Sequence, residues 1–354
     1  MISKIHIKNF VHFKEFKWEK TGKLNIIIGE NDTGKTNLLK LLYSTSRAWS
    51  KFTTDKENNR DKPFNETLAD KIFDTFQPRS NGIGDLVSKK NKSKLEVEIV
   101  YFSDSENKQS IQFQFSRDAK RIIKDTNTFI EPCREKNFNS IFIPPKEVLT
   151  AFDAIQSTRT EEKWMYGFDD TYIDLIKLLQ KPTIQGRQGA NMPEVIRSLD
   201  KLMNGRIYQT KGDEKFIFSR KGNENYSMSM TAEGIKRIGI YITLINNREL
   251  HQGTVLFLDE PEAELHPKAI QVLGNMIYDF ASSGIQVFIS THNYFLLKQL
   301  ELKARENKTE VQCCSLRNSD GVITAEFSDL QKGMPDNPIV DVALELFDQD
   351  IAID

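Results

Sequence analysis

The sequence predicts an α/β protein with a parallel core sheet, and three short apolar runs carry this prediction. Residues 24–28 are nearly continuous in apolar side chains and lead directly into Gly29. Residues 255–258 and 286–289 are two further apolar runs, and a helical pattern follows each of them. A strand that is apolar on both faces is typical of a buried parallel sheet, and alternation of strands with helices is typical of an α/β core.

The N-terminal third adds strands of a different kind. Residues 2–10 and 13–18 alternate apolar and polar side chains, which predicts two hairpin-connected strands with one buried face each. Two more alternating runs, 95–102 and 110–116, flank a polar turn at 104–107 and predict a second hairpin. Together these strands predict a mixed or antiparallel N-terminal sheet.

Two stretches without alternation separate the strands. Residues 50–93 are polar and rich in Lys, Asn and Asp, which predicts loops and short helices. A short apolar run at 140–143 is stopped by two prolines, and a helical pattern then extends from 147 to about 204, with a polar loop at 185–191. We interpret residues 145–205 as an inserted helical lobe.

The last third returns to strands and helices. The isoleucines of 231–247 recur every three or four residues, which predicts an amphipathic helix. The other expected elements are short strands at 206–229, a strand at 310–316, a turn at 320–321 and a helix at 338–347. The expected organisation is a first lobe at 1–144, the helical insertion at 145–205 and a second lobe at 206–354.

Composition excludes several classes of protein. The 354 residues include 49 Lys and Arg against 50 Asp and Glu, so the formal net charge is −1. This balance argues against a generally basic protein that coats DNA. No stretch approaches the ~20 consecutive apolar residues of a membrane span, and the first residues lack the apolar segment of a signal peptide. The three cysteines, two of them adjacent, argue against a disulfide framework, and the histidines show no zinc spacing. We therefore expect a cytoplasmic protein.

One motif carries the chemistry. Residues 29–36 read Gly-Glu-Asn-Asp-Thr-Gly-Lys-Thr and match the phosphate-loop pattern G-x-x-x-x-G-K-[ST] at every fixed position. Gly34 lets the backbone wrap around phosphate oxygens, the Lys35 ammonium reaches the β- and γ-phosphates, and the Thr36 hydroxyl ligates Mg²⁺. The residues expected to bind the nucleotide here are Gly29, Glu30, Asn31, Asp32, Thr33, Gly34, Lys35, Thr36 and Asn37.

Polar side chains follow the other two apolar runs. Asp259 and Glu260 resemble a Walker B element, in which Asp259 would hold Mg²⁺ and Glu260 would act as general base on the attacking water. His292, after the run 286–289, can bond a γ-phosphate or orient that water. The alternatives are an acidic cap on an ordinary strand and a histidine that caps the helix beginning near Asn293. Because the carboxyl ends of parallel strands meet at one edge, we expect these groups to lie together.

These three motifs in this order resemble the ABC-type ATPase superfamily, specifically its SMC/RecF/OLD-like branch. The opening Ile-x-x-Ile-x-Ile-x-Asn-Phe at residues 2–10 is similar to the first strand of those ATPase heads. The run Asp-Glu-Pro-Glu-Ala-Glu-Leu-His-Pro at 259–267 resembles the Walker B and D-loop of stand-alone ATPases of bacterial anti-phage systems, such as Septu, retron and PARIS-like components. The resemblance covers residues 1–50 and 225–300 best. It implies an ABC-ATPase head with a P-loop, ATP hydrolysis, and ATP and Mg²⁺ as cofactors.

The resemblance implies two further elements, and the chain departs from the family in one of them. The family keeps a Leu-Ser-x-Gly-x signature where residues 231–237 stand, but here the hydroxyl and the glycine are one residue further apart. By resemblance Thr231, Glu233 and Gly234 would cap ATP bound by a second subunit; the alternative is an ordinary N-capped helix. Gln77 would be a Q-loop glutamine beside the metal, or else a surface-loop residue.

The function implied by the resemblance is an ATP-gated switch. Two or more heads would close on ATP as a homo-oligomer and control a separate effector, such as a nuclease, in bacterial anti-phage defence. Neither a long coiled coil nor a spaced acidic set for a Toprim nuclease is visible, so we expect an ATPase with no nuclease of its own. Two alternatives stay open. One is a RecF-like repair ATPase that binds nucleic acid, with the lysine-rich runs 51–62 and 89–94 as contacts, and the other is an assembly scaffold with little turnover.

Overall fold

The computed structural model describes residues 1–57, 62–78, 82–89, 93–102, 108–126, 138–157, 167–183, 192–210, 216–222, 224–319 and 321–353. Its strands are β1 (Ile2–Phe10), β2 (Phe13–Trp18), β3 (Leu24–Gly29), β4 (Leu95–Phe102), β5 (Lys108–Phe115), β6 (Asp125–Thr126), β7 (Asn139–Ile143), β8 (Gly205–Gln209), β9 (Phe216–Arg220), β10 (Glu224–Ser227), β11 (Thr254–Asp259), β12 (Gln286–Thr291), β13 (Gln312–Ser319) and β14 (Val322–Asp329). Its helices are α1 (Lys35–Glu57), α2 (Phe64–Phe76), α3 (Phe152–Ser157), α4 (Asp170–Leu179), α5 (Met192–Met203), α6 (Glu233–Asn246), α7 (Pro267–Ser282), α8 (Tyr294–Glu306) and α9 (Pro338–Ile351).

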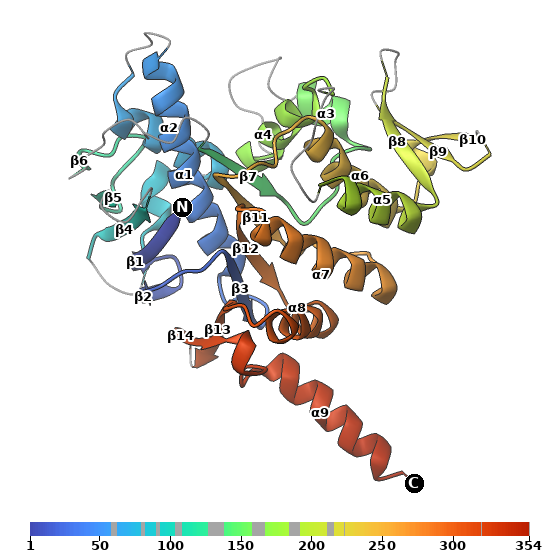
Figure 1. Cartoon of the computed structure of the whole chain (residues 1–354). Helices are drawn as coiled ribbons and strands as arrows, with labels where there is room; N and C mark the ends of the chain where they lie inside the picture. The colour runs from blue at the N-terminus through green and yellow to red at the C-terminus, as the bar shows by residue number, and fades with distance from the viewer. Residues whose placement is uncertain are drawn as a thin grey trace.

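The central sheet has the strand order β14-β13-β3-β12-β11-β7 (Figure 1). From β13 to β7 all neighbours are parallel, and β14 adds an antiparallel edge. Every residue of β3, β11 and β12 is buried, as expected for strands covered on both faces. The predicted α/β core with parallel strands is confirmed.

Alternate side chains of the central strands pack into two hydrophobic cores, one on each face of the sheet. Ile27, Phe257 and Phe288 point to one side, where they pack with α1, α2 and the N-terminal strands. Their neighbours, such as Ile26 and Leu256, point to the other side and pack with α4, α6, α7 and α8. Since successive side chains of a strand point to opposite faces, a strand between two cores must be apolar at every position. The same double packing holds the ends of these strands in place.

The N-terminal strands form a second sheet, in the order β2-β1-β4-β5-β6, with every pair antiparallel. Both predicted hairpins, β1 with β2 and β4 with β5, are confirmed, while the predicted turn at 104–107 lies outside the described residues. Ile5 and Ile7 of β1 are buried in the core that contains α1 and α2. The antiparallel sheet therefore covers the helix that begins at the phosphate loop.

The expectation of loops and short helices over residues 50–93 is wrong in part. Helix α1 continues through Glu57, and residues 64–76 form the 13-residue helix α2. Phe64, Leu68 and Ile72 recur at a spacing of four on the buried face of α2. Charged residues surround this apolar stripe, so the overall composition of residues 50–93 looks polar. The four-residue spacing of the apolar side chains nevertheless indicates an amphipathic helix.

Residues 145–205 contain α3, α4 and α5, as the helical pattern predicts. Their buried side chains, such as Ile155, Leu175 and Leu199, belong to the same hydrophobic core as α6 and one face of the central sheet. The predicted loop at 185–191 lies outside the described residues. The predicted strands of 206–229 form the sheet β10-β9-β8, which Figure 1 shows across the molecule from the N-terminal sheet.

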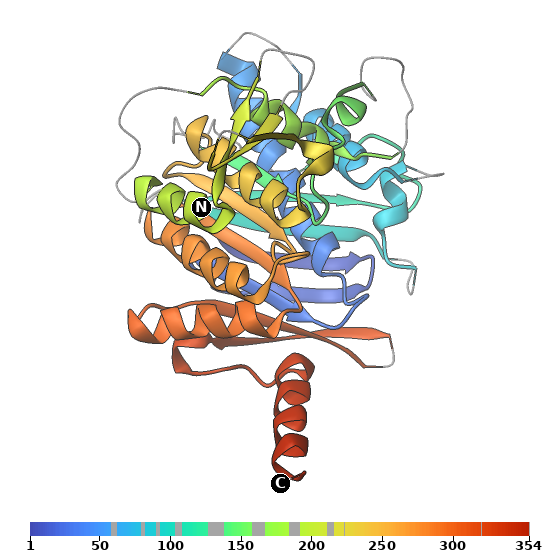
Figure 2. The same ribbon diagram turned by 90° about the vertical axis from the view of Figure 1, so that its right-hand side faces the viewer.

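The C-terminal segment extends the central sheet and then leaves it. β14 returns along β13 as the C-terminal hairpin that the strand at 310–316 and the turn at 320–321 predict. The parallel pairing of β13 with β3 was not predicted. Asp320, in the turn predicted at 320–321, lies outside the described residues. Helix α9 begins at Pro338 as predicted but continues to Ile351, and Figures 1 and 2 show it projecting from the body. In the described part of the chain no helix combines the length and the apolar character of a membrane span.

Candidate nucleotide-binding site

Three strand ends meet at one edge of the central sheet. β12 lies between β3 and β11, and all three are parallel. In this register Asp259 of β11 pairs with Ser290 of β12, and Thr291 of β12 pairs with Ile28 of β3. The three predicted motifs therefore lie side by side, at the carboxyl edge where open α/β sheets bind ligands.

The loop between β3 and α1 requires a glycine at position 34. Gly34 has a φ of +87°, and a Cβ atom there would come within 2.8 Å of the Phe13 ring. The Thr33 hydroxyl donates to the carbonyl of Glu30 at 2.8 Å and closes the turn. Helix α1 then starts at Lys35, so its free N–H groups open onto the loop, which suits a phosphate.

The tip of the loop is open to solvent. Glu30, Asn31 and Asp32 are exposed, and Asn37 in the first turn of α1 is half-buried. Asp32 lies 3.7 Å from Nε2 of His12, in the turn after β1. These four predicted nucleotide-binding residues are thus placed around the loop, and their backbone rather than their side chains shapes it.

Lys35 is the buried cation of this loop. Its Nζ donates to the carbonyl oxygens of Gly29 and Glu30 at 2.8 and 2.7 Å, and the residue is 6% exposed. Burial lowers the pKa of Lys35, while the carboxylates of Glu260 and Asp259 oppose the shift. A bound phosphate would bring further negative charge to a cation that is largely removed from water.

Thr36 and Asp259 join α1 to β11. The Thr36 hydroxyl lies 3.0 and 2.9 Å from the two carboxylate oxygens of Asp259, and the Ser290 hydroxyl donates to the same carboxylate. Asp259 is 1% exposed, and burial raises its pKa despite these two donors. Hydroxyl and carboxylate oxygens are ligands that Mg²⁺ prefers. The two side chains therefore fit a Mg²⁺ whose other ligands would come from a phosphate and water.

Glu260 and His292 face each other beyond the tips of β11 and β12. Oε1 of Glu260 lies 3.2 Å from Nδ1 of His292, and both side chains reach solvent. Glu260 has a φ of +47°, and its N–H donates to the Ser290 carbonyl at 3.0 Å. A strained backbone of this kind persists where the surroundings hold it, and here the hydrogen bond to β12 does so. The arrangement suits a carboxylate that accepts a proton from water and a histidine that orients it.

The alternative for His292, a cap on the following helix, does not hold. Asn293 is the N-cap of α8, and its side chain accepts the N–H of Leu296 at 3.1 Å. The His292 ring is therefore left to contact Glu260.

Two polar residues at these strand tips were not predicted as site residues. One is Ser290, whose hydroxyl donates to Asp259. The other is Glu262, which is 4% exposed, accepts the Thr291 hydroxyl and has a pKa that burial raises. The second carboxylate oxygen of Glu262 has no hydrogen-bond partner among the described residues. Both residues lie within three positions of Asp259 or His292, so closeness to a strand end was the available signal.

The signature-like segment lies at the N-terminus of α6. The Thr231 hydroxyl donates to the carbonyl of Ser227 at 2.8 Å, and Glu233 accepts from Lys236 at 2.6 Å. Gly234 packs against the loop that follows β11, and α6 has no side-chain N-cap. Among the described residues these polar contacts stay within the α6 region, so they do not join Thr231, Glu233 or Gly234 to the phosphate loop of the same chain.

Gln77 lies at the margin of the site. It ends α2 with a φ of +45°, and its Nε2 donates to the carbonyl of Phe168 at 3.1 Å. Asp169, which follows Phe168, accepts a hydrogen bond from Lys40 of α1 at 2.6 Å. The charge of Lys40 in turn opposes the rise that burial causes in the pKa of Asp259. The side-chain contacts of Gln77 in the described chain thus run to residues 167–168, and its role at the metal stays a prediction.

The lysine-rich runs are only partly visible. Lys51 is exposed on α1, Lys62 pairs with Asp70, and residues 58–61 and 90–92 lie outside the described residues.

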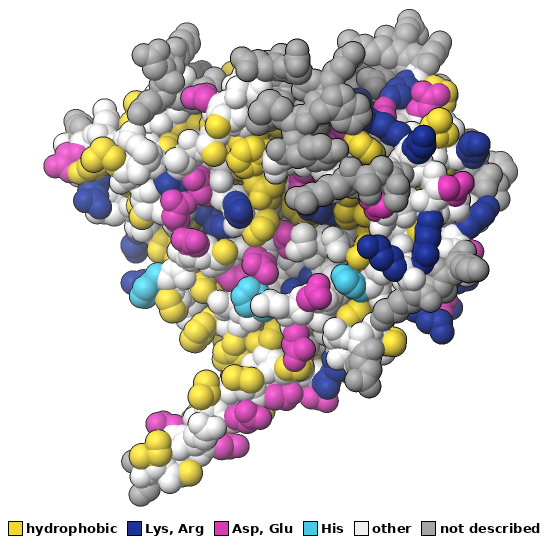
Figure 3. All heavy atoms as spheres, turned by 180° about the vertical axis from the view of Figure 1, so that it is seen from behind, with side chains coloured by type: hydrophobic (Ala, Val, Ile, Leu, Met, Phe, Trp, Pro, Cys, Tyr) yellow, Lys and Arg dark blue, Asp and Glu magenta, His cyan; other side chains and the backbone are white. Residues whose placement is uncertain are grey.

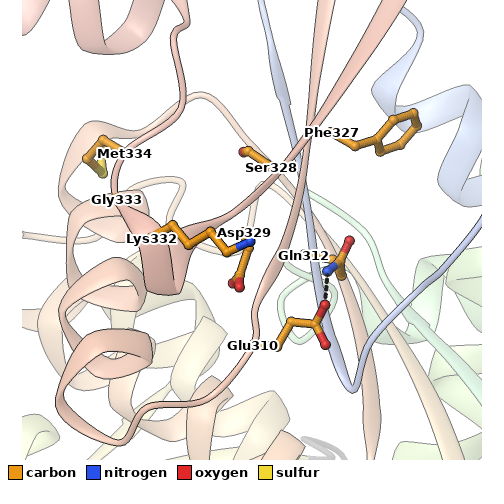
Figure 4. Close-up of a pocket in the computed structure, with 8 residues that line it drawn as sticks. All are labelled: Glu310, Gln312, Phe327, Ser328, Asp329, Lys332, Gly333 and Met334. Carbon is orange, nitrogen blue, oxygen red and sulfur yellow. Dashed lines mark hydrogen bonds between the residues drawn. The ribbon is translucent and has the colours of Figure 1, made fainter.

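A hollow of about 450 Å³ lies at the β13–β14 hairpin, away from the phosphate loop (Figure 4). Its wall includes Glu310, which bonds Gln312, and Asp329, which accepts two backbone N–H groups. None of its lining residues belongs to the phosphate loop or the strand tips, so we assign it no role in nucleotide binding.

Comparisons with known proteins agree with this geometry. The family described as "AAA domain, putative AbiEii toxin, Type IV TA system" matches residues 24–298. An ATP/GTP phosphatase of Helicobacter pylori is 22% identical over 336 residues, which cover 86% of this chain and 89% of that protein. A DNA replication and repair protein RecF of Clostridium kluyveri is 28% identical over 62% of this chain and 57% of that protein. The Old nuclease of Escherichia phage P2 is 35% identical over 22% of this chain and 12% of that protein.

The fold is shared with a solved ATPase head. The crystal structure of an SMC head bound to the C-winged helix domain of ScpA aligns with a TM-score of 0.56 at 15% identity, over 94% of this chain and 98% of that one. The fold is therefore the ABC-type P-loop head that the motifs predict. Because the family match spans well over half of the sequence, this chain belongs to that AAA-domain family, within the SMC/RecF/OLD-like branch of ABC-type ATPases.

Proposed function

We propose that this chain binds ATP with Mg²⁺ and hydrolyses it, and that the nucleotide gates contact with a separate effector protein. The observation that carries the proposal is the convergence of Lys35, Thr36, Asp259 and Glu260 at one edge of the sheet. The full-length similarity to an ATP/GTP phosphatase supports hydrolysis.

The proposed roles follow from the geometry. Backbone N–H groups of the loop and Lys35 bind the phosphates, and Thr36 with Asp259 holds Mg²⁺, which would neutralise charge on the phosphates. Ser290 positions the Asp259 carboxylate through its hydroxyl. Glu260 accepts the proton of the attacking water, with His292 at 3.2 Å to orient it.

A second copy of the chain would complete the site. The polar contacts of Thr231 and Glu233 stay near α6. Because α6 has no side-chain N-cap, the backbone N–H groups of its first turn, next to Gly234, would face a phosphate held by another head. We therefore propose a homo-oligomer in which ATP is sandwiched between heads. Binding of the γ-phosphate would favour the closed oligomer, and hydrolysis would release it.

The effector is proposed on family grounds. The family description names a toxin–antitoxin system, and one similar SMC head carries a bound ScpA domain. A role in bacterial anti-phage defence, with a nuclease as one type of effector, is consistent with both. The proposed lobes are 1–144, the helical insertion at 145–205, and 206–354.

Two substitutions test the proposal. Lys35→Ala should abolish ATP binding, measured with a fluorescent analogue, while Lys51→Ala on the exposed face of α1 should not. Glu260→Gln should lower phosphate release by about 100-fold or more and trap a nucleotide-bound oligomer in light scattering, with Glu306→Gln as the surface control. Retained binding in Lys35→Ala would refute the nucleotide site. Turnover that Glu260→Gln leaves unchanged would refute the catalytic assignment, and negligible turnover in the unaltered chain would favour the scaffold alternative.

One observation favours the RecF-like alternative. A hollow of about 430 Å³ between α5 and the sheet of β8 and β9 is lined by Arg197, Lys201, Arg206, Arg220 and Lys221, with Asp200 as its one acid and Tyr208 exposed beside it. Basic groups next to an aromatic ring are typical of single-stranded nucleic acid sites. Fluorescence anisotropy with labelled DNA over a salt series tests this, because each lost phosphate contact should reduce the salt slope by about one. Arg206→Ala and Lys221→Ala are the informative variants, with Lys4→Ala on β1 as control.

A further inference from the structure

Glu262 is a buried carboxylate next to the proposed catalytic pair, and the proposed function leaves it without a role. It lies in the turn that follows β11 and is 4% exposed. Its Oε1 atom accepts the hydroxyl of Thr291 at the end of β12, while Oε2 has no hydrogen-bond partner among the described residues. A buried carboxylate with so few partners lowers stability, and an apolar side chain of similar size would avoid that cost. Packing alone therefore does not explain the carboxylate.

The Thr291 hydroxyl holds the chain on both sides of His292. It donates to Glu262 and accepts the N–H of Asn293 at 3.0 Å. His292 is the single residue between these two points, and Asn293 in turn caps α8. Once Glu262 fixes Thr291, the backbone that carries the His292 ring has little freedom to turn.

The ends of β11 and β12 are joined on both faces of the sheet. On the side of α1, Asp259 accepts the Ser290 hydroxyl. Because successive side chains of a strand point to opposite faces, Thr291 points to the other side, where α6, α7 and α8 pack. Glu262 reaches Thr291 there, and its charge adds to the rise that burial causes in the pKa of Tyr241 on α6. The contact of Glu262 with Thr291 thus holds the strand ends from the side that Asp259 does not reach.

The pair next to this contact is open to solvent. The side chains of Glu260 and His292 are 31% and 53% exposed. Figure 3 shows histidine and acidic side chains close together on the surface of one face of the molecule. An exposed ring is not fixed by packing, so its direction depends on the backbone that carries it. The 3.2 Å contact between Glu260 and His292 therefore depends on how firmly residues 291–293 are held.

We propose that Glu262 is a positioning residue for ATP hydrolysis: it fixes Thr291, and through Thr291 it keeps the His292 ring directed at Glu260. The inference rests on the proposed function, in which Glu260 and His292 act on the attacking water. Glu262 acts only through this contact and binds neither the nucleotide nor the water. It should therefore affect turnover much more than ATP affinity, and only while His292 is present.

Substitutions at both ends of the contact test the proposal. Glu262→Leu removes the acceptor at similar volume and Thr291→Val removes the hydroxyl. Each should lower steady-state phosphate release by about 10-fold or more and change ATP affinity by less than about threefold. Glu262→Gln keeps an oxygen that can accept the hydroxyl and should restore most of the turnover. Unchanged turnover in Glu262→Leu and Thr291→Val would overturn the proposal.

Tyr241→Phe is the matched control. It removes a hydroxyl that is buried on the same side of the sheet and has no hydrogen-bond partner among the described residues. Turnover in this variant should equal that of the unaltered chain. A loss as large as that of Glu262→Leu would mean that any change in this part of the core lowers turnover, which contradicts the proposal.

A double-mutant cycle with His292→Gln separates positioning from stability. If Glu262 acts through His292, Glu262→Leu should cause no further loss of turnover in the His292→Gln background. A merely structural role would give the same fold loss in both backgrounds, and that result would overturn the proposal. Thr291→Val takes the place of Glu262→Leu in the cycle if the latter does not fold.

Mobility of the His292 ring tests the contact without turnover. NMR relaxation of the nucleotide-free chain with isotope-labelled histidine measures it, and the signal that His292→Gln lacks is that of His292. The ring should become more mobile in Glu262→Leu and Thr291→Val but not in Tyr241→Phe. These changes in a chain that hydrolyses no ATP would refute the proposed function and still support the placement of His292 by Glu262. Unchanged mobility in Glu262→Leu and Thr291→Val would overturn the inference.

Discussion

The Glu260 carboxylate lies 3.2 Å from Nδ1 of His292, although a helix and a strand separate the two residues in the sequence. The parallel pairing of β11 with β12 produces this contact, because it aligns the ends of the two strands. It couples the proposed proton acceptor to the side chain that would orient the water. The two residues should therefore affect turnover more strongly than nucleotide affinity.

His292→Gln should lower ATP turnover by about 100-fold, because the water would lose its orienting partner while the phosphate loop stays intact. ATP affinity should change by less than about threefold, since His292 is not expected to carry the binding of the phosphates. Steady-state phosphate release and equilibrium binding measure the two quantities. His6→Gln, at the exposed pair with Glu15, is the control. Equal losses of affinity and turnover would assign His292 to binding instead.

Gly34→Ala should destabilise the fold by about 1–3 kcal/mol and greatly weaken nucleotide binding, because a φ of +87° strains a Cβ that also meets Phe13. Gly222 has a φ of +110° with nothing within 4 Å, so Gly222→Ala isolates the strain from the collision. Urea unfolding and ATP binding provide the measurements. Similar losses in both variants would show that the contact with Phe13 contributes little.

Asp259 should release Mg²⁺ earlier than an exposed aspartate as the pH falls. Burial raises the pKa of this carboxyl, so protonation begins at a higher pH and removes the proposed metal ligand. The Mg²⁺ dependence of ATP-analogue binding, followed by calorimetry at decreasing pH, reports the effect. Asp259→Asn should lose both the Mg²⁺ dependence and its pH dependence. If Asp259→Asn kept the same Mg²⁺ dependence of ATP-analogue binding as the unaltered chain, Asp259 would not be a metal ligand.

Asp174→Asn should destabilise the protein by about 1.5–3 kcal/mol, because it removes the charged acceptor that Tyr43, Arg47 and Lys71 share. Lys71 keeps its pair with Asp170 at 2.9 Å, and Arg47 keeps its hydrogen bond to Asn139 at 3.0 Å. Asp174 of α4 accepts the Tyr43 hydroxyl at 2.6 Å, lies 3.4 Å from Arg47 of α1, and pairs with Lys71 of α2. Chemical unfolding measures the loss, and the exposed Asp153→Asn is the control. A change below about 1 kcal/mol would mean that this network contributes little to stability.

The same carboxylate should make the fold sensitive to acid. Burial alone would raise the pKa of Asp174, but Lys71 and Arg47 outweigh it and hold the pKa well below its usual range. With a folded-state pKa below the unfolded value of about 3.9, the stabilisation is present above that pH and is lost as the pH falls through the folded pKa. Asp174→Asn should therefore show a smaller loss of stability on acidification than the unaltered chain.

Much of the candidate site could be predicted because its motifs are local. The pattern at 29–36 needs only a strand, a glycine loop and a helix start, and all three are encoded in adjacent residues. Short helices were expected over residues 50–93, but the position and length of α2 were not predicted, because its apolar stripe is short and lies within a charged stretch. Ser290 and Glu262 were missed because their roles depend on partners in other segments.

The sequence by itself determined the fold class, the phosphate loop and the polar ends of three buried strands. These properties follow from glycine conformation and from apolar runs, which act over a few residues. The sequence also predicted that Thr36, Asp259, Glu260 and His292 would share one edge of the sheet. Only the tertiary structure decided the direct contacts, which join Glu260 to His292, Thr36 to Asp259 and Gln77 to residues 167–168. It also decided that α9 leaves the body with its apolar face open. Strand register and helix packing bring together residues that are far apart in the sequence, and a local sequence pattern does not encode such long-range contacts.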